Sequence, residues 1–265
     1  MTNIHSTALV DPGAELGSAV EIGPYSVVGP MVQLGDGCRV HSHVVITGNT
    51  SIGSKCEVFP FASVGNVPQD LKFGGEESRL VIGDNTIIRE HATLNPGTEG
   101  GGMGTRVGSN CFLMVASHVA HDCQLGDYVV LANNSTLAGH CVVQDHAILG
   151  GMTGFHQFVR IGAYAFIGGM SGVAGDVIPF GMVIGNRGAL SGLNIIGMRR
   201  HGFEKEQIHN LRKAYRLLFS VDGTLKERME DVEKMFEDDA CVARILEFIR
   251  AGSDRSLCLP KNNVE

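Results

Sequence analysis

An apolar residue recurs at every sixth position through most of this chain. Steps of six from residue 4 to residue 64 meet an apolar side chain eleven times in succession. The pattern resumes over residues 82–94 and, one residue out of phase, over residues 107–173. A period of six matches neither an α-helix, which repeats about every 3.6 residues, nor a strand, which repeats about every 2. The chain must therefore form a repeat structure in which each hexapeptide is one unit.

Tandem hexapeptides are typical of a triangular parallel β-helix, in which three repeats make one coil of about 18 residues. The apolar residue points into the prism, and a small or β-branched residue four positions later, such as Val44 or Ala62, packs beside it at the corner. Successive coils rise by about 4.8 Å. Such folds are usually left-handed, an exception to the right-handed crossover rule. We predict an all-β, left-handed parallel β-helix.

Five of the seven cysteines occupy that small interior position. They are Cys38, Cys56, Cys111, Cys123 and Cys141. None belongs to a CxxC pair, the close spacing that zinc sites commonly use. We therefore expect buried structural thiols, which suit a reducing compartment.

Composition changes sharply after residue 198. Residues 1–198 contain 8 basic residues, 15 acidic residues and 33 glycines, whereas residues 199–265 contain 13 basic residues, 13 acidic residues and 3 glycines. The second part has apolar residues at helical spacing and a capping box at residues 224–227, which starts a helix. We predict a β-helical domain over residues 1–198 and a small α-helical domain over residues 199–265.

Several classes of protein are disfavoured by the composition. The net charge of −7 argues against a nucleic-acid binder. No run approaches the roughly 18 apolar residues that a membrane span needs, and the first residues lack the pattern of a secretory signal. We expect a cytoplasmic protein that neither spans a membrane nor binds nucleic acid.

Two insertions interrupt the repeat. The first, residues 66–78, carries Gln69, Asp70 and Lys72 as polar side chains. The second, residues 97–104, reads GTEGGGMG; it is expected to be flexible and to offer few functional groups.

Histidines gather in one part of the repeat: His118, His121, His140, His146 and His156. Gly139, beside His140, lies one coil after His121, and Gln157, beside His156, lies one coil further on. The spacing predicts that His121, His140 and His156 lie on one outer corner within about 10 Å. Asp122 directly follows His121 and could orient its ring.

The spacing alone leaves the use of this corner open. One interpretation is general-base catalysis, because imidazole titrates near neutral pH. Another is a zinc enzyme with three histidine ligands, similar to a β-helical carbonic anhydrase. A third is a non-catalytic scaffold, in which the loops and histidines would be dispensable.

Several segments of the chain closely resemble the UDP-N-acetylglucosamine O-acyltransferase family, which opens lipid A synthesis. They are NVPQDLKF (66–73), SHVAHDC (117–123), LANNSTLAGH (131–140), GGMTGFHQF (150–158) and NIIGMRRHGF (194–203). The resemblance covers the whole length. It implies transfer of a (3R)-3-hydroxyacyl group from acyl carrier protein to UDP-N-acetylglucosamine without a cofactor or a metal. It also implies a homotrimer with active sites between subunits.

The resemblance also implies roles for individual residues. His121 matches the general base, Asp122 its supporting carboxylate, and Gly139 the backbone N–H donor to the oxyanion. Gly169 matches the position that limits acyl-chain length; it would leave room for a long chain that the adjacent Met170 could shorten. The expected contacts to the nucleotide sugar and acyl group are Gln69, Asp70, Lys72, His118, His140, His156, Gln157, Asn194 and Arg200.

The chain departs from the family pattern at two places. Asn95 and Pro96 replace a His and an Arg of the motif IHRGT, and His201 replaces a common Arg. Some family members acylate a 3-amino sugar instead of a 3-hydroxyl, and the sequence does not distinguish these acceptors. A basic group, Arg199, Arg200, Arg212, Lys213 and Arg216, follows the acidic first part. It is interpreted either as a solvated helix face or as a docking surface for acyl carrier protein.

Overall fold

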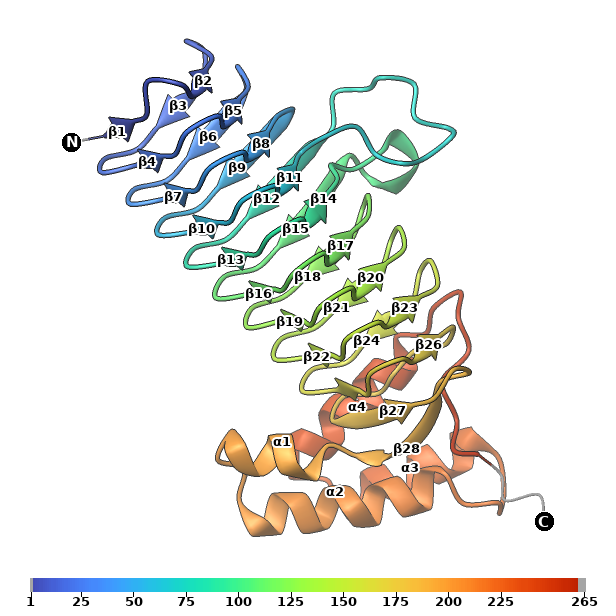
Figure 1. The fold of residues 1–265 in the computed structure, drawn as a ribbon. Coiled ribbons are helices and arrows are strands. Elements are labelled where there is room, and N and C mark those ends of the chain that lie inside the picture. Colours follow the sequence, from blue (N-terminus) through green and yellow to red (C-terminus); the bar gives the residue numbers. More distant parts are fainter. Residues whose placement is uncertain (1, 262–265) are drawn as a thin grey trace.

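The computed structural model describes residues 2–261 as a β-helical prism followed by a small helical unit (Figure 1). Three parallel sheets, here named A, B and C, form the sides of the prism, and each regular coil contributes one strand to each sheet. The coil is left-handed, which confirms the predicted fold class. Each corner is named below by the two sheets that the chain joins there.

The bounds of the strands follow the hexapeptide repeat. Sheet A contains β1 (Asn3–Ile4), β4 (Glu21–Ile22), β7 (Arg39–Val40), β10 (Glu57–Val58), β13 (Ile87–Ile88), β16 (Phe112–Leu113), β19 (Val130–Leu131), β22 (Ile148–Leu149), β25 (Phe166–Ile167), β27 (Gly181–Ile184) and β28 (Ala189–Leu193). Sheet B contains β2 (Leu9–Val10), β5 (Val27–Val28), β8 (Val45–Ile46), β11 (Ser63–Val64), β14 (Thr93–Leu94), β17 (His118–Val119), β20 (Thr136–Leu137), β23 (Gly154–Phe155) and β26 (Gly172–Val173). Sheet C contains β3 (Glu15–Leu16), β6 (Val32–Leu34), β9 (Asn49–Ile52), β12 (Arg79–Ile82), β15 (Gly104–Val107), β18 (Gln124–Leu125), β21 (Val142–Val143) and β24 (Arg160–Ile161).

The core is a stack of equivalent apolar side chains. Strands of neighbouring coils pair in register, so that Val119 lies beside Leu137 and Leu137 beside Phe155. Burial of each such side chain contributes roughly 1.5–3 kcal/mol. The first coil is the exception, because no coil lies below it: Ile4 follows the repeat but stays 44% exposed.

The cysteines of the repeat are buried free thiols, as expected. Their sulfur atoms donate to carbonyl oxygens of the next coil, for example from Cys123 to Ala138 at 3.2 Å and from Cys141 to His156 at 3.3 Å. The thiols are thus both packed and hydrogen-bonded inside the prism.

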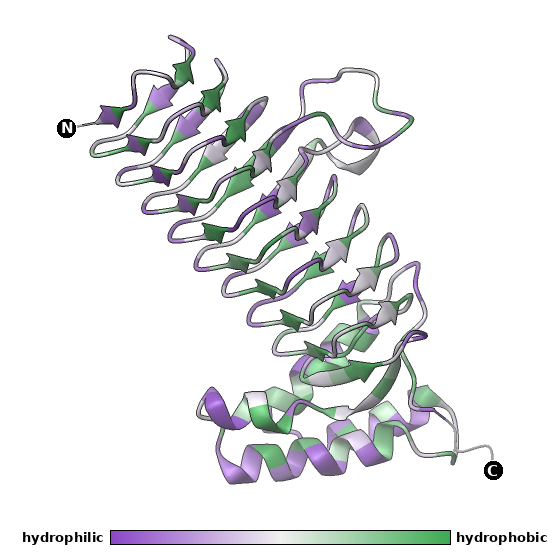
Figure 2. Ribbon diagram, viewed as in Figure 1, coloured by the Kyte–Doolittle hydropathy of each residue, from purple (hydrophilic) through white to green (hydrophobic). Residues whose placement is uncertain are grey.

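The helical unit begins slightly earlier than the change of composition. After the antiparallel pair β27–β28 come α1 (Ile195–Arg200), α2 (Lys205–Leu218), α3 (Leu225–Met235) and α4 (Ala240–Arg250). The expected boundary after residue 198 falls inside α1. The capping box predicted at residues 224–227 is present at the start of α3. Figure 2 shows hydrophilic and hydrophobic residues alternating along α2, whose apolar side chains pack inward.

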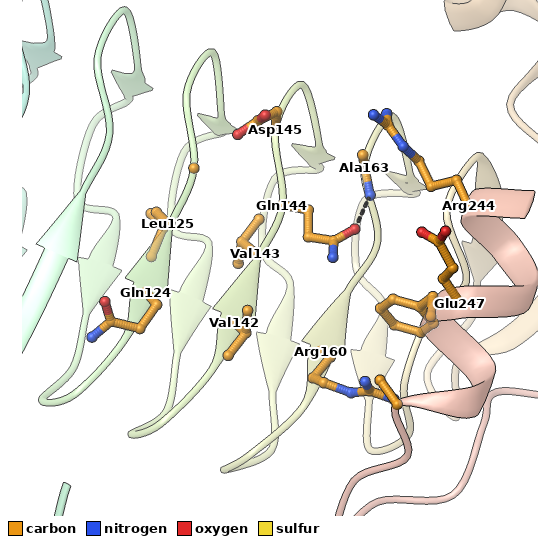
Figure 3. A pocket seen from close by; sticks show the side chains of 13 residues that line it. Gln124, Leu125, Val142, Val143, Gln144, Asp145, Arg160, Ala163, Arg244 and Glu247 are labelled. Atoms are coloured by element: carbon orange, nitrogen blue, oxygen red, sulfur yellow. Dashed lines mark hydrogen bonds between the residues drawn. The ribbon is translucent and has the colours of Figure 1, made fainter. Parts of the chain in front are cut away.

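Helix α4 packs against the end of sheet C. The Arg160 guanidinium lies 4.3 Å from the centre of the Phe248 ring. Beside this contact is a cavity of about 600 Å³, lined by residues of sheet C and by Arg244 and Glu247 of α4 (Figure 3). None of the site residues predicted from the sequence lines it. Among residues 2–261, no helix combines the length and apolar character required to cross a bilayer.

Candidate active site

The BC corner brings together most of the predicted site residues. The chain turns there from sheet B to sheet C once per coil, and both insertions leave the prism at this corner, between β11 and β12 and between β14 and β15. His118 lies on β17 of sheet B, between β14 and β20. The other predicted residues at this corner are Gln69, Asp70, Lys72, His121, Asp122, Gly139, His140, His156 and Gln157.

His121 and Asp122 form a buried hydrogen-bonded pair. The His121 Nδ1 atom lies 2.8 Å from Asp122 Oδ2, and the two residues are only 7% and 4% exposed. A carboxylate can only accept, so Nδ1 carries the proton and Nε2 is left with a free lone pair. His121 lies at a corner, as expected, and its partner Asp122 is contacted there by Thr98 of the second insertion.

The second insertion holds the Asp122 carboxylate in place, a role that the sequence reasoning missed. The Thr98 backbone N–H donates to Oδ1 at 2.9 Å, and the Thr98 hydroxyl donates to Oδ2 at 2.6 Å. A side chain at Gly101 would overlap this carboxylate. The glycine run, interpreted as mere flexibility, is the one sequence signal of this close approach.

Gly139 provides a flat backbone surface for the His121 ring. A Cβ atom at position 139 would lie 2.5 Å from Cε1 and 2.6 Å from Nε2 of His121, which no ordinary contact permits. Among residues 2–261, no group accepts a hydrogen bond from the Gly139 N–H. The corner therefore places Gly139, whose N–H has no acceptor among the described residues, against the ring of His121.

Two further histidines adjoin this pair, and the pKa of each is lowered. Burial lowers the pKa of His118, and a positive charge on His121 would lower it further; the His118 Nδ1 lies 2.7 Å from Thr93 Oγ1. Burial is also the main cause that lowers the pKa of His140. The His140 ring meets that of His121 edge-on at 5.0 Å and stacks on Phe158 at 4.4 Å. A lowered pKa favours the neutral form of both rings, so neither adds a positive charge beside the His121–Asp122 pair.

The first insertion lies beside these histidines. Asp70 Oδ1 accepts from the Lys72 backbone N–H at 3.0 Å, and both side-chain charges act on His140. Asn95, one of the departures from the family pattern, is buried and donates from Nδ2 to Asn66 O at 3.0 Å. Asn95 therefore anchors the beginning of this loop.

Three ligand-type atoms of His121, Asp122 and His140 lie within 4.8 Å of one another, as a metal site requires. However, Asp122 Oδ2 already accepts from Thr98 and His121, and Oδ1 accepts from Thr98. A metal ion on Oδ2 would have to displace both donors. The arrangement fits a carboxylate that orients a histidine better than one that binds zinc.

The structure places four predicted residues away from this corner. Asn194 caps α1 and donates from Nδ2 to Tyr164 O, at the CA corner. Arg200 follows on α1, and His201 contacts His146 and Tyr164 edge-on at the same corner. Gly169 and Met170 lie at the AB corner, between β25 and β26, and Met170 is 73% exposed. One chain alone therefore does not unite all the predicted contacts.

Comparisons with known proteins show which family the chain belongs to. A family model described as UDP N-acetylglucosamine O-acyltransferase, domain 2, matches residues 176–258, and a bacterial transferase hexapeptide model matches residues 13–48 and 104–139. Two curated relatives are acyl-[acyl-carrier-protein]–UDP-N-acetylglucosamine O-acyltransferases. The one from Caulobacter vibrioides is 49% identical over 262 residues, which is 99% of this chain and the full length of the relative. The one from Methylobacterium radiotolerans is 57% identical over 194 residues, 73% of this chain and 71% of the relative.

A solved structure of LpxA from Acinetobacter baumannii superposes on this chain with a TM-score of 0.93 at 44% identity. The match covers 96% of this chain and 98% of the other. Sequence and fold thus agree over nearly the entire length, including the helical unit. The chain belongs to the UDP-N-acetylglucosamine O-acyltransferase family.

Proposed function

We propose that this protein transfers a (3R)-3-hydroxyacyl group from acyl carrier protein to the glucosamine 3-position of UDP-N-acetylglucosamine, the first step of lipid A synthesis. The names of the relatives state the donor and the acceptor. The observation that carries the proposal is the buried His121–Asp122 pair, whose imidazole ring lies against the backbone of Gly139. We further propose that the reaction takes place in the cytoplasm.

His121 acts as the general base. Its Nε2 removes the proton from the 3-hydroxyl as the hydroxyl oxygen attacks the thioester carbonyl carbon. Asp122 stabilises the imidazolium that forms and holds Nδ1 in the required tautomer. This orientation is set before substrate binds, because Thr98 already fixes the carboxylate.

The Gly139 N–H receives the developing oxyanion. A backbone donor fixed by the prism needs no reorganisation during the reaction, which makes such donors effective. Collapse of the tetrahedral intermediate forms the ester and breaks the carbon–sulfur bond. The leaving thiolate of the carrier then takes the proton from His121, which restores the neutral base.

The remaining predicted residues bind the substrates. Gln69, Asp70 and Lys72 hold the sugar nucleotide at the first insertion, and the other contacts come from His118, His140, His156, Gln157, Asn194 and Arg200. Asn194 and Arg200 lie at the CA corner, whereas His121 lies at the BC corner. This separation supports a homotrimer in which a neighbouring subunit supplies these two residues. Gly169 and Met170 set the room available to the acyl chain.

The decisive experiment incubates the protein with UDP-N-acetylglucosamine and acyl carrier proteins of different chain lengths, followed by mass spectrometry of the acylated nucleotide sugar. The ester product should be formed, and His121→Ala should lower its rate by about 10²–10⁴-fold, as loss of a general base does. Retention of more than half the rate by the variant would show that the base is assigned wrongly. An amide product formed only with a 3-amino sugar would correct the acceptor.

A further inference from the structure

The last described residues of the chain return to the prism as a strap, residues 253–259. Figure 1 shows this segment, in red, running beside the last coils after α4. Asp176, fully buried, is its anchor: its N–H donates to Ser256 O, its carbonyl accepts from Cys258 N, and its carboxylate accepts from Ser253 Oγ at 2.6 Å. Arg160 holds the same carboxylate at 2.7 Å. The strap is therefore fixed along its length.

The strap places one guanidinium group against the BC corner. Arg255 Nε donates to Gln157 O at 2.8 Å, and Arg255 Nη2 lies 2.6 Å from His156 Nδ1. These two atoms belong to one planar group, so the guanidinium binds both neighbours at once. The contact joins residues 99 positions apart in the sequence.

This contact determines which nitrogen atom of the His156 ring can donate a hydrogen bond. An arginine side chain has only donors, so His156 Nδ1 must accept and the proton of the neutral ring lies on Nε2. The Gln157 carbonyl oxygen, 3.5 Å from Nδ1, already accepts from Arg255. Without Arg255, the exposed ring could rotate about its broad terminal torsion and exchange its donor and acceptor atoms.

We propose that Arg255 is a positioning residue for acyl transfer, which acts through His156 by presenting Nε2–H as a fixed hydrogen-bond donor to an oxygen atom of the substrate. This inference rests on the proposed function, in which His156 contacts substrate. His156 borders a groove of about 760 Å³ along sheet B, where Gly154 and Gly172 leave the strands without side chains. Apolar side chains of the strap, Leu257 and Leu259, form part of its lining. Arg187 is the one charged residue of a mainly apolar lining, so the groove suits the acyl chain of the donor better than the charged nucleotide.

The direct test is nitrogen NMR of the full-length protein labelled at histidine, with the His156 signals assigned by their loss in His156→Ala. The expected ring is the Nε2–H tautomer with a hydrogen-bonded Nδ1, and Arg255→Ala should shift the Nδ1 resonance to its unbonded position. Arg255→Lys, which keeps a donor, should retain part of the shift. A proton on Nδ1, or no change in Arg255→Ala, would overturn the proposal. This measurement needs no activity, so it remains decisive if acyl transfer is not observed.

A kinetic cycle tests whether the residue acts through His156. Arg255→Ala should lower kcat/KM by about tenfold, the order of effect expected for one lost hydrogen bond to a charged donor. In the His156→Ala background the same change should have no further effect, because coupled residues are not additive. Arg250→Ala, which removes an exposed arginine of α4, is the matched control and should leave the rate unchanged. An equal loss in both backgrounds would mean that Arg255 serves only to hold the strap.

Discussion

Replacing Gly139 by alanine tests the proposed arrangement of the BC corner most sharply. The new Cβ would lie 2.5 Å from His121 Cε1, whereas ordinary contacts begin at 3.4 Å, so the ring must move by about 0.9 Å. Such a shift disturbs the 2.8 Å hydrogen bond between His121 and Asp122. A misplacement of about 1 Å can cost roughly 10²-fold in rate, and we expect a loss of kcat of this order.

The same change should leave the fold intact. Gly139 is not among the glycines with positive φ, so alanine introduces no backbone strain there. The atoms it meets are the end of one side chain, which can move. We therefore expect the thermal unfolding midpoint to change little while the steady-state rate of acyl transfer falls.

Gly151→Ala provides the matched control for Gly139→Ala. Gly151 begins the turn at the AB corner, and its added Cβ would come no closer than 3.3 Å to Asn133 O. This variant should keep nearly the full rate. If Gly139→Ala retained more than a third of wild-type kcat, or if both alanine variants lost activity equally, the proposed contact between the His121 ring and Gly139 would be refuted as the basis of catalysis.

Three further changes probe other parts of the molecule. Thr98→Val removes one hydrogen-bond donor from the buried Asp122 carboxylate while keeping the side-chain shape, so kcat should fall by about tenfold. An unchanged kcat would show that Thr98 does not orient Asp122. Cys123→Trp should prevent folding, because it overfills a fully buried corner; a folded variant by circular dichroism and gel filtration would contradict the assigned repeat register. Arg212→Glu combined with Arg216→Glu should raise the KM for the acyl donor in a salt-dependent way and spare the KM for the sugar nucleotide, because exposed charges steer acidic partners. Equal changes in both KM values, or none, would assign these arginines to a solvated surface.

The repeat could be predicted because every coil packs equivalent side chains into the prism in the same way. An apolar side chain points inward every six residues, and Leu113 and Leu131 are equivalent positions one coil apart. This pattern identifies the core before any contact is known. The contact between His121 and Asp122 could likewise be predicted, because the two residues are adjacent in the sequence. The α-helical unit could also be predicted from the sequence, since the capping box at Thr224 and the apolar spacing of α2 are short-range signals.

Contacts made by the loops and the strap could not be predicted in this way. Thr98 reaches Asp122 across 24 residues, and Arg255 reaches His156 across 99. Neither follows the period of six, because an insertion and a returning strap are free to approach the prism anywhere. The sequence identified the two insertions, but nothing in it pointed to the strap.

The amino-acid sequence by itself determined the prism, its buried residues and the corner that holds His121, since these depend on a short pattern that every coil repeats. The tertiary structure alone decided that the second insertion closes over Asp122 and that Asn194 and Arg200 stand at a different corner from His121. The physical reason is that coil stacking propagates local geometry, whereas loop closure and helix docking are settled by contacts between distant parts of the chain.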